Sequence, residues 1–502
     1  MARTTAVIDP AFVVGEVDRR IFGSFVEHMG RCVYTGIYEP GHPRADAHGF
    51  REDVADLTRE AGVSLVRYPG GNFVSGYRWE DGVGPVADRP RRLDLAWRSL
   101  ETNEVGTNEF LGWADRVGVE PMMALNLGTR GVQEAVDLVE YVNTPGGTAL
   151  SDLRAAHGRR DPWGVRLWCL GNEMDGPWQT GHKTAEEYGR LALETAKSVR
   201  QVDPSLELVA CGSSSREMPT FGRWEATVLD HAYDEVDYIS LHAYYEETEG
   251  DRASFLASAV SMDDFISSVV ATADHVGAVR RSRKKVHLSF DEWNVWYQSR
   301  FVGHTELSLE ERPRLIEDTY SVVDAVAVGG FLATLVDHAD RVKIGCQAQL
   351  ANVIGLVRSE PAGPAWRQSI FHPFAQTARL ARGVALRTQA RGATHETRAH
   401  GEVASVQVTA TWDEDSGSLA VFLVNRHPDE DQDVSLVLRA FPDLSVRDAL
   451  CLGGQDPDLT NTEQAPDAVT PRRVPVPAPV DGVLDLRLPP GSWTALDLTT
   501  RP

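Results

Sequence analysis

The chain has 502 residues, of which 42% are hydrophobic and 25% are charged, the ordinary balance of a globular protein. This composition excludes a disordered chain, a collagen-like fibre and a small disulfide-stabilised domain. Asp and Glu number 73 against 50 Lys and Arg, a formal net charge of −23, and such an acidic surface repels nucleic acid and anionic lipid. We therefore expect a neutral substrate, with no nucleic acid and no membrane as partner.

From about residue 20 to residue 340, short apolar runs alternate with segments of 3.6-residue periodicity. Near-continuous apolar strands are typical of parallel sheets with two buried faces. Eight such runs separated by helices predict a closed (β/α)₈ TIM barrel, an α/β fold. The competing doubly wound open sheet would be expected to carry a GxGxxG turn after its first strand, and none follows it here. The predicted strands are 21–27, 63–67, 122–126, 165–170, 206–211, 238–242, 286–290 and 327–335.

After about residue 380 the pattern changes to short strands separated by turn-rich stretches, such as 413–417 and 453–458. Half-buried antiparallel strands at this spacing indicate a C-terminal β-sandwich, which we expect to be jelly-roll-like. Strands expected in the first 18 residues, at 6–8 and 12–14, would join it. The predicted division is therefore a catalytic barrel over 19–375 and a sandwich made of 1–18 plus 376–502. The predicted sandwich strands are 403–412, 419–425, 434–438 and 483–488, with the proline-rich 471–479 as an edge or connector.

The cysteines and the N-terminus bear on the cellular compartment. The five cysteines are scattered, with no CxxC pair, which favours a reducing environment. Residues 1–20 lack a basic segment followed by an apolar one, so no signal peptide is expected. The longest apolar stretch, 321–336, is too short to span a bilayer. We predict a cytoplasmic protein.

Two glutamates follow predicted strands at the end where barrel enzymes hold their reactive groups. Glu173 comes after the fourth strand and Glu292 after the seventh, and both lie among Asn and Trp residues. Paired carboxyls facing one cleft are what glycoside hydrolysis requires, one to protonate the leaving oxygen and one to attack or to activate water. A glutamate after a strand can also be a helix-capping or ion-pairing residue, and spacing alone does not decide between these interpretations.

The segments around these glutamates resemble glycoside hydrolase family 51, the α-L-arabinofuranosidases, in their intracellular bacterial type. Residues 171–179 read GNEMDGPWQ and residues 290–297 read FDEWNVWY, similar to the family's acid/base and nucleophile motifs. The likeness covers essentially the whole barrel and includes FGSFVEH at 22–28, RYPGGNF at 67–73, WEDGVGP at 79–85, SLHAY at 240–244 and QLANV at 349–353.

The resemblance implies a retaining, exo-acting enzyme that releases terminal non-reducing α-L-arabinofuranosyl residues from arabinoxylan- or arabinan-derived oligosaccharides. Glu292 would be the nucleophile and Glu173 the acid/base of a double displacement. The family likeness also implies a homo-oligomer, by analogy a hexamer. Another retaining barrel glycosidase, an endoglucanase or a β-xylosidase, is the nearest alternative. A metal-dependent sugar isomerase and a non-catalytic carbohydrate-binding protein are more distant ones.

The resemblance also assigns supporting roles around the two glutamates. Asn172 would bond the sugar 2-hydroxyl, and Tyr244 would orient the nucleophile or bind substrate. Arg67 would keep Glu292 ionised, although it could equally form an ordinary strand-end ion pair. The remaining hydroxyls and the apolar walls would be contacted by Glu27, Asn72, Gln349, Trp97 and Trp296.

No cofactor is expected. The sequence has no HExxH motif, no P-loop and no dinucleotide-binding fingerprint. Four histidines fall near predicted strand ends or loops, but none has a second ligand at helical spacing, so we expect no metal site and hydrogen bonds to neighbours or substrate instead. These histidines are His28, His182, His242 and His338.

Overall fold

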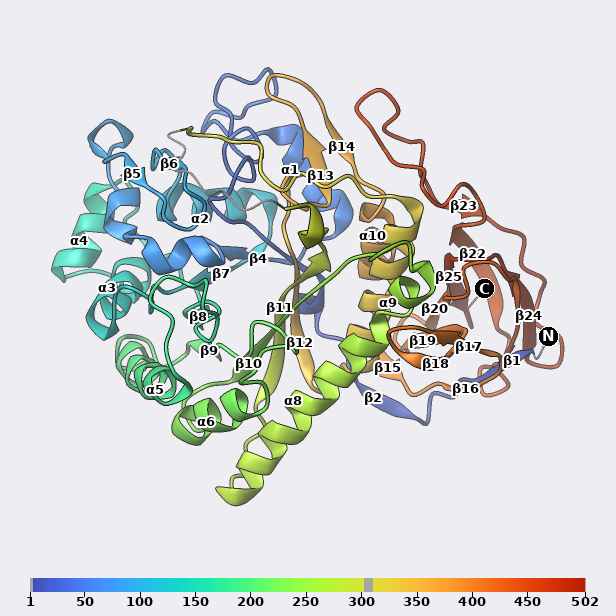
Figure 1. Cartoon of the computed structure of the whole chain (residues 1–502). Helices are drawn as coiled ribbons and strands as arrows, with labels where there is room; N and C mark the ends of the chain where they lie inside the picture. The colour runs from blue at the N-terminus through green and yellow to red at the C-terminus, as the bar shows by residue number, and fades with distance from the viewer. Residues whose placement is uncertain (1–2, 302–309, 502) are drawn as a thin grey trace.

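The computed structural model describes residues 3–301 and 310–501. Eight parallel strands close into a barrel in the order β10-β11-β12-β3-β4-β7-β8-β9, with helices on its outside (Figure 1). The predicted (β/α)₈ barrel is thereby confirmed. Its strands are β3 (Gly23–Phe25), β4 (Leu65–Tyr68), β7 (Glu120–Ala124), β8 (Leu167–Leu170), β9 (Glu207–Ala210), β10 (Tyr238–Tyr245), β11 (His287–Val295) and β12 (Val342–Gln347).

The helices begin and end where the local sequence supplies caps. Thr184 and Glu187 form a reciprocal capping box at the start of α5, and Gly62, with φ of 73°, ends α1 in the left-handed conformation that glycine adopts without strain. The helices are α1 (Glu52–Ala61), α2 (Thr107–Val117), α3 (Val132–Asn143), α4 (Ala149–Ala156), α5 (Ala185–Val202), α6 (Arg223–Ala232), α7 (Arg252–Leu256), α8 (Ala259–Val279), α9 (Val322–Asp337) and α10 (Phe371–Leu380).

The prediction of the eighth strand was wrong. Residues 327–335 lie in the middle of α9, and the chain forms the last barrel strand afterwards, as β12. A continuous apolar run is typical of a strand that is buried on both faces. A helix that is buried on all sides gives the same pattern, because it has no polar face, and α9 is such a helix. Ser321 and Asp324 cap its first turn and were the sequence signal for a helix.

The C-terminal part forms two sheets that pack face to face. One has the order β16-β1-β21-β24 and the other β2-β15-β19-β20-β25-β22-β23. The two N-terminal strands, drawn in blue, lie among the orange and red strands of this part (Figure 1). The strands are β1 (Thr4–Val7), β2 (Val13–Glu16), β15 (Val384–Leu386), β16 (Gln389–Arg391), β19 (Val406–Asp413), β20 (Ser418–Asn425), β21 (Gln432–Val437), β22 (Ser445–Leu452), β23 (Arg472–Arg473), β24 (Val483–Leu488) and β25 (Ser492–Thr499).

Three short two-stranded sheets complete the described elements. They pair β5 (Arg92–Leu93) with β6 (Leu100–Glu101), β13 (Val357–Ser359) with β14 (Ala365–Arg367), and β17 (Thr394–Thr397) with β18 (Gly401–Ala404). Ser405 separates β18 from β19, so the single strand predicted at 403–412 is two strands.

The central strands β20 and β25 of the seven-stranded sheet are buried on both faces, unlike the half-buried strands that we predicted. Along β20, Leu419, Val421 and Leu423 face the core between the two sheets. Ala420, Phe422 and Val424 belong to the core that continues into the barrel. Helix α9 lies between the barrel and this sheet, and it therefore joins the two parts of the molecule (Figure 1).

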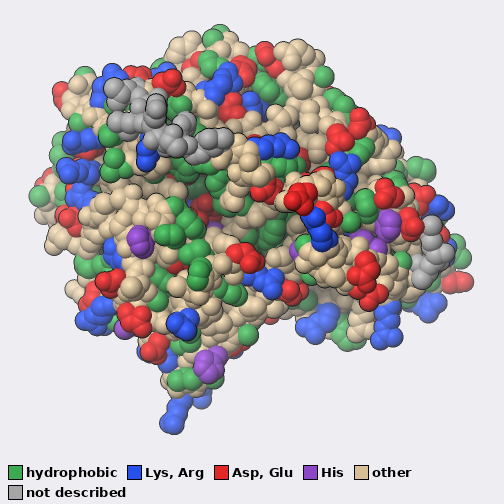
Figure 2. All heavy atoms as spheres, in the orientation of Figure 1, with side chains coloured by type: hydrophobic (Ala, Val, Ile, Leu, Met, Phe, Trp, Pro, Cys, Tyr) green, Lys and Arg blue, Asp and Glu red, His purple; other side chains and the backbone are tan. Residues whose placement is uncertain are grey.

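The acidic residues do not gather into one patch on the surface that Figure 2 shows. On the face shown in Figure 2, acidic and basic side chains are intermingled. Over the described residues, no helix combines the length and the apolar character that crossing a bilayer demands.

Candidate active site

Glu173 and Glu292 meet in a cavity of about 700 Å³. With His242 they form a buried cluster in which one oxygen or nitrogen atom of each residue lies within 4.8 Å of the others. Glu173 comes three residues after β8, in a turn in which Gly171 and Glu173 both have positive φ. In the barrel order β9 and β10 stand between β8 and β11, and β10 supplies His242.

The register of β10 against β11 brings the reactive groups together. His242 pairs directly with Glu292, after a register shift that follows Ser240. Such an irregularity bends a strand and re-aims its side chains. Because side chains opposite each other on neighbouring strands share a face, His242 points to the same side as Glu292 and lies next to the residues that line the cavity.

Glu292 is held by two donors. Tyr244 Oη donates to its Oε1 at 2.6 Å, and Arg67 Nη1 donates to its Oε2 at 3.2 Å. Burial is the main influence on this carboxyl and raises its pKa; His242 and Arg67 oppose that rise, while the charge of Glu173 adds to it. The cationic neighbours therefore favour the ionised form that a nucleophile needs.

Glu173 has partners on both of its oxygens. His242 Nδ1 lies 2.9 Å from Oε1, and Trp178 Nε1 donates to Oε2 at 2.7 Å. Trp178 is 52% exposed, so this second contact lies at the side of the cavity that is open to solvent.

His242 lies among three carboxylates. Besides Glu173, it is 3.6 Å from Glu292 Oε2 through Nδ1 and 3.3 Å from Asp291 Oδ1 through Nε2. Burial disfavours the imidazolium, but the three acidic neighbours outweigh burial and raise the pKa of His242 to about 10. The cluster thus holds a proton at neutral pH.

Glu27 forms a second polar group on the other side of the cavity. Its Oε1 accepts from Trp97 Nε1 at 2.9 Å and from the backbone N–H of Phe73, and its Oε2 accepts from Gln349 Nε2 at 3.1 Å. Burial, followed by the charge of Glu292, raises the pKa of Glu27 to about 8. A Cβ on Gly70, whose φ is 147°, would lie 2.5 Å from Glu27 Cγ, so this loop can pass the carboxylate only with glycine there.

The structure brings most of the predicted site residues together. Arg67 and Asn172, each 1% exposed, lie behind the residues that line the cavity, and Arg67 Nη2 donates to Asn172 Oδ1 at 2.6 Å. Asn172 Nδ2 then faces Asn72 Oδ1 at 3.5 Å. The predicted residues that line the cavity are Glu27, Asn72, Trp97, Glu173, Tyr244, Glu292, Trp296 and Gln349.

Several residues in or beside the cavity received no specific role from the sequence. His242 was one of four histidines to which the sequence assigned no role. It could have been recognised as a site residue because it lies at the end of a predicted strand, two residues before Tyr244. Trp178 lies in the loop after β8 and carried no signal beyond its motif. Ile316 lies more than twenty residues after β11, with no pattern to link it to the site.

The same cluster could by residue type bind a cation. Within the described part of the chain, Glu173, His242 and Glu292 form one group of potential metal ligands. Their contacts argue against that use, because the Arg67 guanidinium already lies 3.2 Å from Glu292 and would repel a second cation. Two of the other histidines singled out in the sequence have different partners: His28 binds Tyr68 and Glu101, and His338 pairs with Asp263.

Known proteins similar to this chain in sequence are α-L-arabinofuranosidases. An α-L-arabinofuranosidase 1 domain model matches residues 57–259, and an α-L-arabinofuranosidase C-terminal domain model matches residues 291–492. The chain is 57% identical over 492 residues to the intracellular exo-α-(1→5)-L-arabinofuranosidase of Streptomyces lividans, covering 97% of this chain and 74% of the relative. It is 50% identical over 502 residues to the exo-α-(1→6)-L-arabinofuranosidase of Bifidobacterium longum, covering 98% and 96%.

Solved structures agree in fold along the whole chain. AbfB, a family 51 α-L-arabinofuranosidase from Bifidobacterium longum, superposes with a TM-score of 0.95 at 44% identity and covers 99% of both chains. The α-L-arabinofuranosidase of Thermotoga maritima in its arabinose complex superposes with a TM-score of 0.87 at 31% identity, covering 98% of this chain and 99% of that one.

Proposed function

This chain belongs to the α-L-arabinofuranosidases of glycoside hydrolase family 51, which are retaining exo-acting enzymes, and on that premise we propose that Glu292 is its nucleophile and Glu173 its acid/base. One observation carries the proposal: the two glutamates face each other with carboxylate oxygens within 4.8 Å. A retaining site needs carboxyls about 5–5.5 Å apart, whereas an inverting site needs roughly 6.5–9.5 Å to admit a water.

In the first step a Glu292 oxygen attacks the anomeric carbon, and the glycosidic C–O bond breaks. The leaving oxygen takes a proton from Glu173. Tyr244 and Arg67 hold Glu292 on the attacking side, at 2.6 and 3.2 Å. The result is a covalent arabinofuranosyl-enzyme ester.

In the second step water attacks the same carbon, its proton goes to Glu173, and the ester bond to Glu292 breaks. His242 supports this exchange, because its Nδ1 lies 2.9 Å from Glu173 and the pair can hold the proton that Glu173 gives and takes. Esterification removes the negative charge of Glu292, so the cluster then holds one anion fewer and Glu173 is free to act as a base.

The remaining polar groups bind the sugar hydroxyls. With a pKa of about 8, Glu27 is mostly protonated at neutral pH and can donate to a hydroxyl as well as accept from one. Asn72 and Gln349 present amide groups beside it, and Asn172 faces the cavity through Asn72. Trp97 and Trp296 form the apolar walls against which the sugar ring packs.

We propose terminal α-L-arabinofuranosyl residues of arabinan- and arabinoxylan-derived oligosaccharides as substrates, with the α-(1→5) linkage between arabinofuranosyl units preferred, hydrolysed in the cytoplasm. The names of relatives that are 57% and 52% identical, which are intracellular exo-α-(1→5)-L-arabinofuranosidases, support this. A relative of 50% identity is named for the (1→6) linkage, so rates on the two arabinobiose isomers test the preference. Activity in the culture medium of intact cells would contradict a cytoplasmic site.

The catalytic assignment is tested with 4-nitrophenyl α-L-arabinofuranoside. We expect Glu292→Ala and Glu173→Ala to lose at least about a hundredfold in kcat, the usual range for removing such a group. The exposed Glu186 at the start of α5 provides a control, Glu186→Ala, that keeps full activity. Azide should restore turnover with an inverted product in Glu292→Ala and a retained product in Glu173→Ala. Full activity of Glu292→Ala would refute the mechanism.

We also propose that the chain forms a homo-oligomer, a hexamer by analogy with its family. Light scattering coupled to size-exclusion chromatography checks this directly, and a monomeric mass would contradict it.

A further inference from the structure

Ile316 has an unusual backbone conformation in the wall of the cavity. It lines the cavity together with Ile354 and Trp296, and its φ is 49°. A β-branched residue is rarely found in this left-handed region, because its side chain then crowds its own backbone. Such a conformation persists only where the surrounding contacts determine it.

The residues on either side of Ile316 supply those contacts. Leu315 is 4% exposed and packs where Gly30 leaves room, since a Cβ on Gly30 would lie 3.0 Å from Leu315 Cβ. The Ile316 carbonyl accepts from the backbone N–H of Ile354 at 3.0 Å. Glu317 follows, with a side chain that is only 9% exposed.

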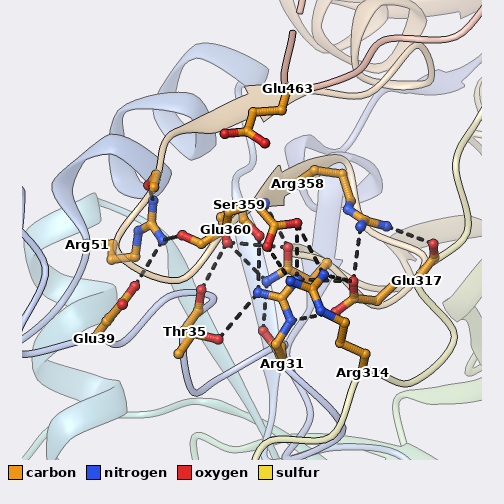
Figure 3. Close-up of polar contacts among 12 residues, drawn as sticks. Arg31, Thr35, Glu39, Arg51, Arg314, Glu317, Arg358, Ser359, Glu360 and Glu463 are labelled. Atoms are coloured by element: carbon orange, nitrogen blue, oxygen red, sulfur yellow. Dashed lines mark hydrogen bonds and ion pairs between the residues drawn. The ribbon is translucent and has the colours of Figure 1, made fainter.

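Glu317 is the centre of an ion-pair network (Figure 3). Arg31 binds both of its carboxylate oxygens, through Nε at 2.6 Å and Nη2 at 3.0 Å. Arg358 binds its Oε2 at 3.0 Å and its backbone carbonyl at 2.7 Å. Arg314 Nη1 donates to the same Oε2 at 2.9 Å.

Two arginines of the network, Arg31 and Arg358, are anchored in the interior of the protein. Arg31 is 3% exposed and follows β3, while Arg358 lies in β13. Arg314 also pairs with Glu360, whose backbone carbonyl accepts from the fully buried Arg51 at 2.9 Å. The segment that carries Ile316 is thus tied to two separate elements of the fold by one carboxylate.

We propose that Glu317 is a positioning residue that holds Ile316 in the wall of the sugar-binding cavity and thereby sets how tightly the enzyme binds arabinofuranosides. The inference rests on the proposed function, because it takes the cavity as the substrate site. Glu317 does not line the cavity, so it acts through Ile316. Ile316 is an apolar side chain that neither forms a bond with the substrate nor transfers a proton. Its loss therefore weakens binding of the substrate and of the transition state alike.

The first measurement is steady-state kinetics of Glu317→Gln, which keeps the size of the side chain and removes its charge. We expect KM for 4-nitrophenyl α-L-arabinofuranoside to rise roughly five- to tenfold, the effect of a small apolar misfit, with kcat changed less than about twofold. The inhibition constant for L-arabinose should rise in parallel. Glu311→Gln is the matched control, because Glu311 lies in the same segment and forms an exposed pair with Arg91; its KM should not change.

A double-mutant cycle separates positioning from general structural support. Ile316→Ala removes the group that Glu317 positions, so Glu317→Gln should have little further effect on KM in that background. An equal rise of KM in both backgrounds, or an unchanged KM in folded Glu317→Gln, would overturn the proposal. If Glu317→Gln does not fold, Arg358→Gln is used in the same cycle and judged by the same outcomes. The proposed catalytic roles fail separately, through the activity of Glu292→Ala.

Discussion

Burial of the Glu27 carboxyl in the cavity makes the stability of the fold depend on pH. Glu27 is 2% exposed, and its pKa of about 8 means that the folded protein holds its proton far more tightly than the unfolded chain does. Burial contributes most to this shift, and the charge of Glu292 adds to it. Glu27 therefore stabilises the fold fully only below its unfolded pKa near 4.5, and that contribution is lost as the pH rises through about 8.

We predict that Glu27→Gln becomes progressively more stable than the wild type as the pH rises. A neutral side chain has no charge to bury, so the two proteins should have similar Tm values at pH 5. The variant should melt a few degrees higher at pH 8, since about 1 kcal/mol corresponds to roughly 1 °C for a chain of this length. Calorimetry at the two pH values checks this. The same variant should lose activity, and a Tm difference that shrinks towards pH 8 would be inconsistent with the shift.

Among the secondary-structure elements, α9 depends on its surroundings. All residues from Val322 to Val336 are buried, and two adjacent glycines show how closely the helix is packed. A Cβ on Gly329 would lie 2.2 Å from Trp493 Cδ1, whereas a Cβ on Gly330 would have its nearest neighbours at 3.4 and 3.5 Å. The helix therefore approaches the seven-stranded sheet through Gly329.

We expect Gly329→Ala to destabilise the protein by about 1–3 kcal/mol, because the new methyl overlaps a buried indole. Gly330→Ala is the matched control: its methyl fits, and the change should be neutral or stabilising by up to about 1 kcal/mol, since alanine is the better helix former. Urea unfolding of both variants measures the difference. Equal stabilities would show that Trp493 can move aside at no cost.

At the scale of the whole molecule, the two parts share one core. Phe422 and Trp493 of the seven-stranded sheet belong to the same apolar cluster as the barrel strands. The N-terminal β1 and β2 pair with strands from the C-terminal part, one in each of its two sheets, so the two ends of the chain meet in the same part of the molecule. The predicted boundary at residue 375 falls within α10, which runs from Phe371 to Leu380.

We predict that a chain of residues 19–375 does not fold to an active enzyme. Truncation would expose the face of α9 that packs on β19, β20 and β25, a contiguous apolar surface that favours aggregation. Soluble yield, size-exclusion profile and activity measure the outcome. A monodisperse truncated barrel that hydrolyses 4-nitrophenyl α-L-arabinofuranoside would contradict the shared-core interpretation.

The sequence predicted those features that depend on local pattern. The strands β8 and β11 follow from short apolar runs, and the barrel follows from the alternation of such runs with helices. The motif around Glu173 located that residue just after its strand, as observed. Glu292 was expected just after a strand ending at residue 290, but it lies inside β11, which continues to Val295. Residues 327–335 were mistaken for a strand because a helix buried on all sides loses the 3.6-residue periodicity by which it would be recognised.

What only the tertiary structure decided are the contacts between segments far apart in the chain. His242 lies beside Glu173 and Glu292 because β10 and β11 pair in one particular register. Ile316 lines the cavity in a segment whose next residue, Glu317, pairs with Arg31, 286 residues away in sequence. Periodicity and motifs report how one segment divides its own side chains between core and solvent. They carry no information on which distant side chains then meet, because that depends on the packing of the whole molecule.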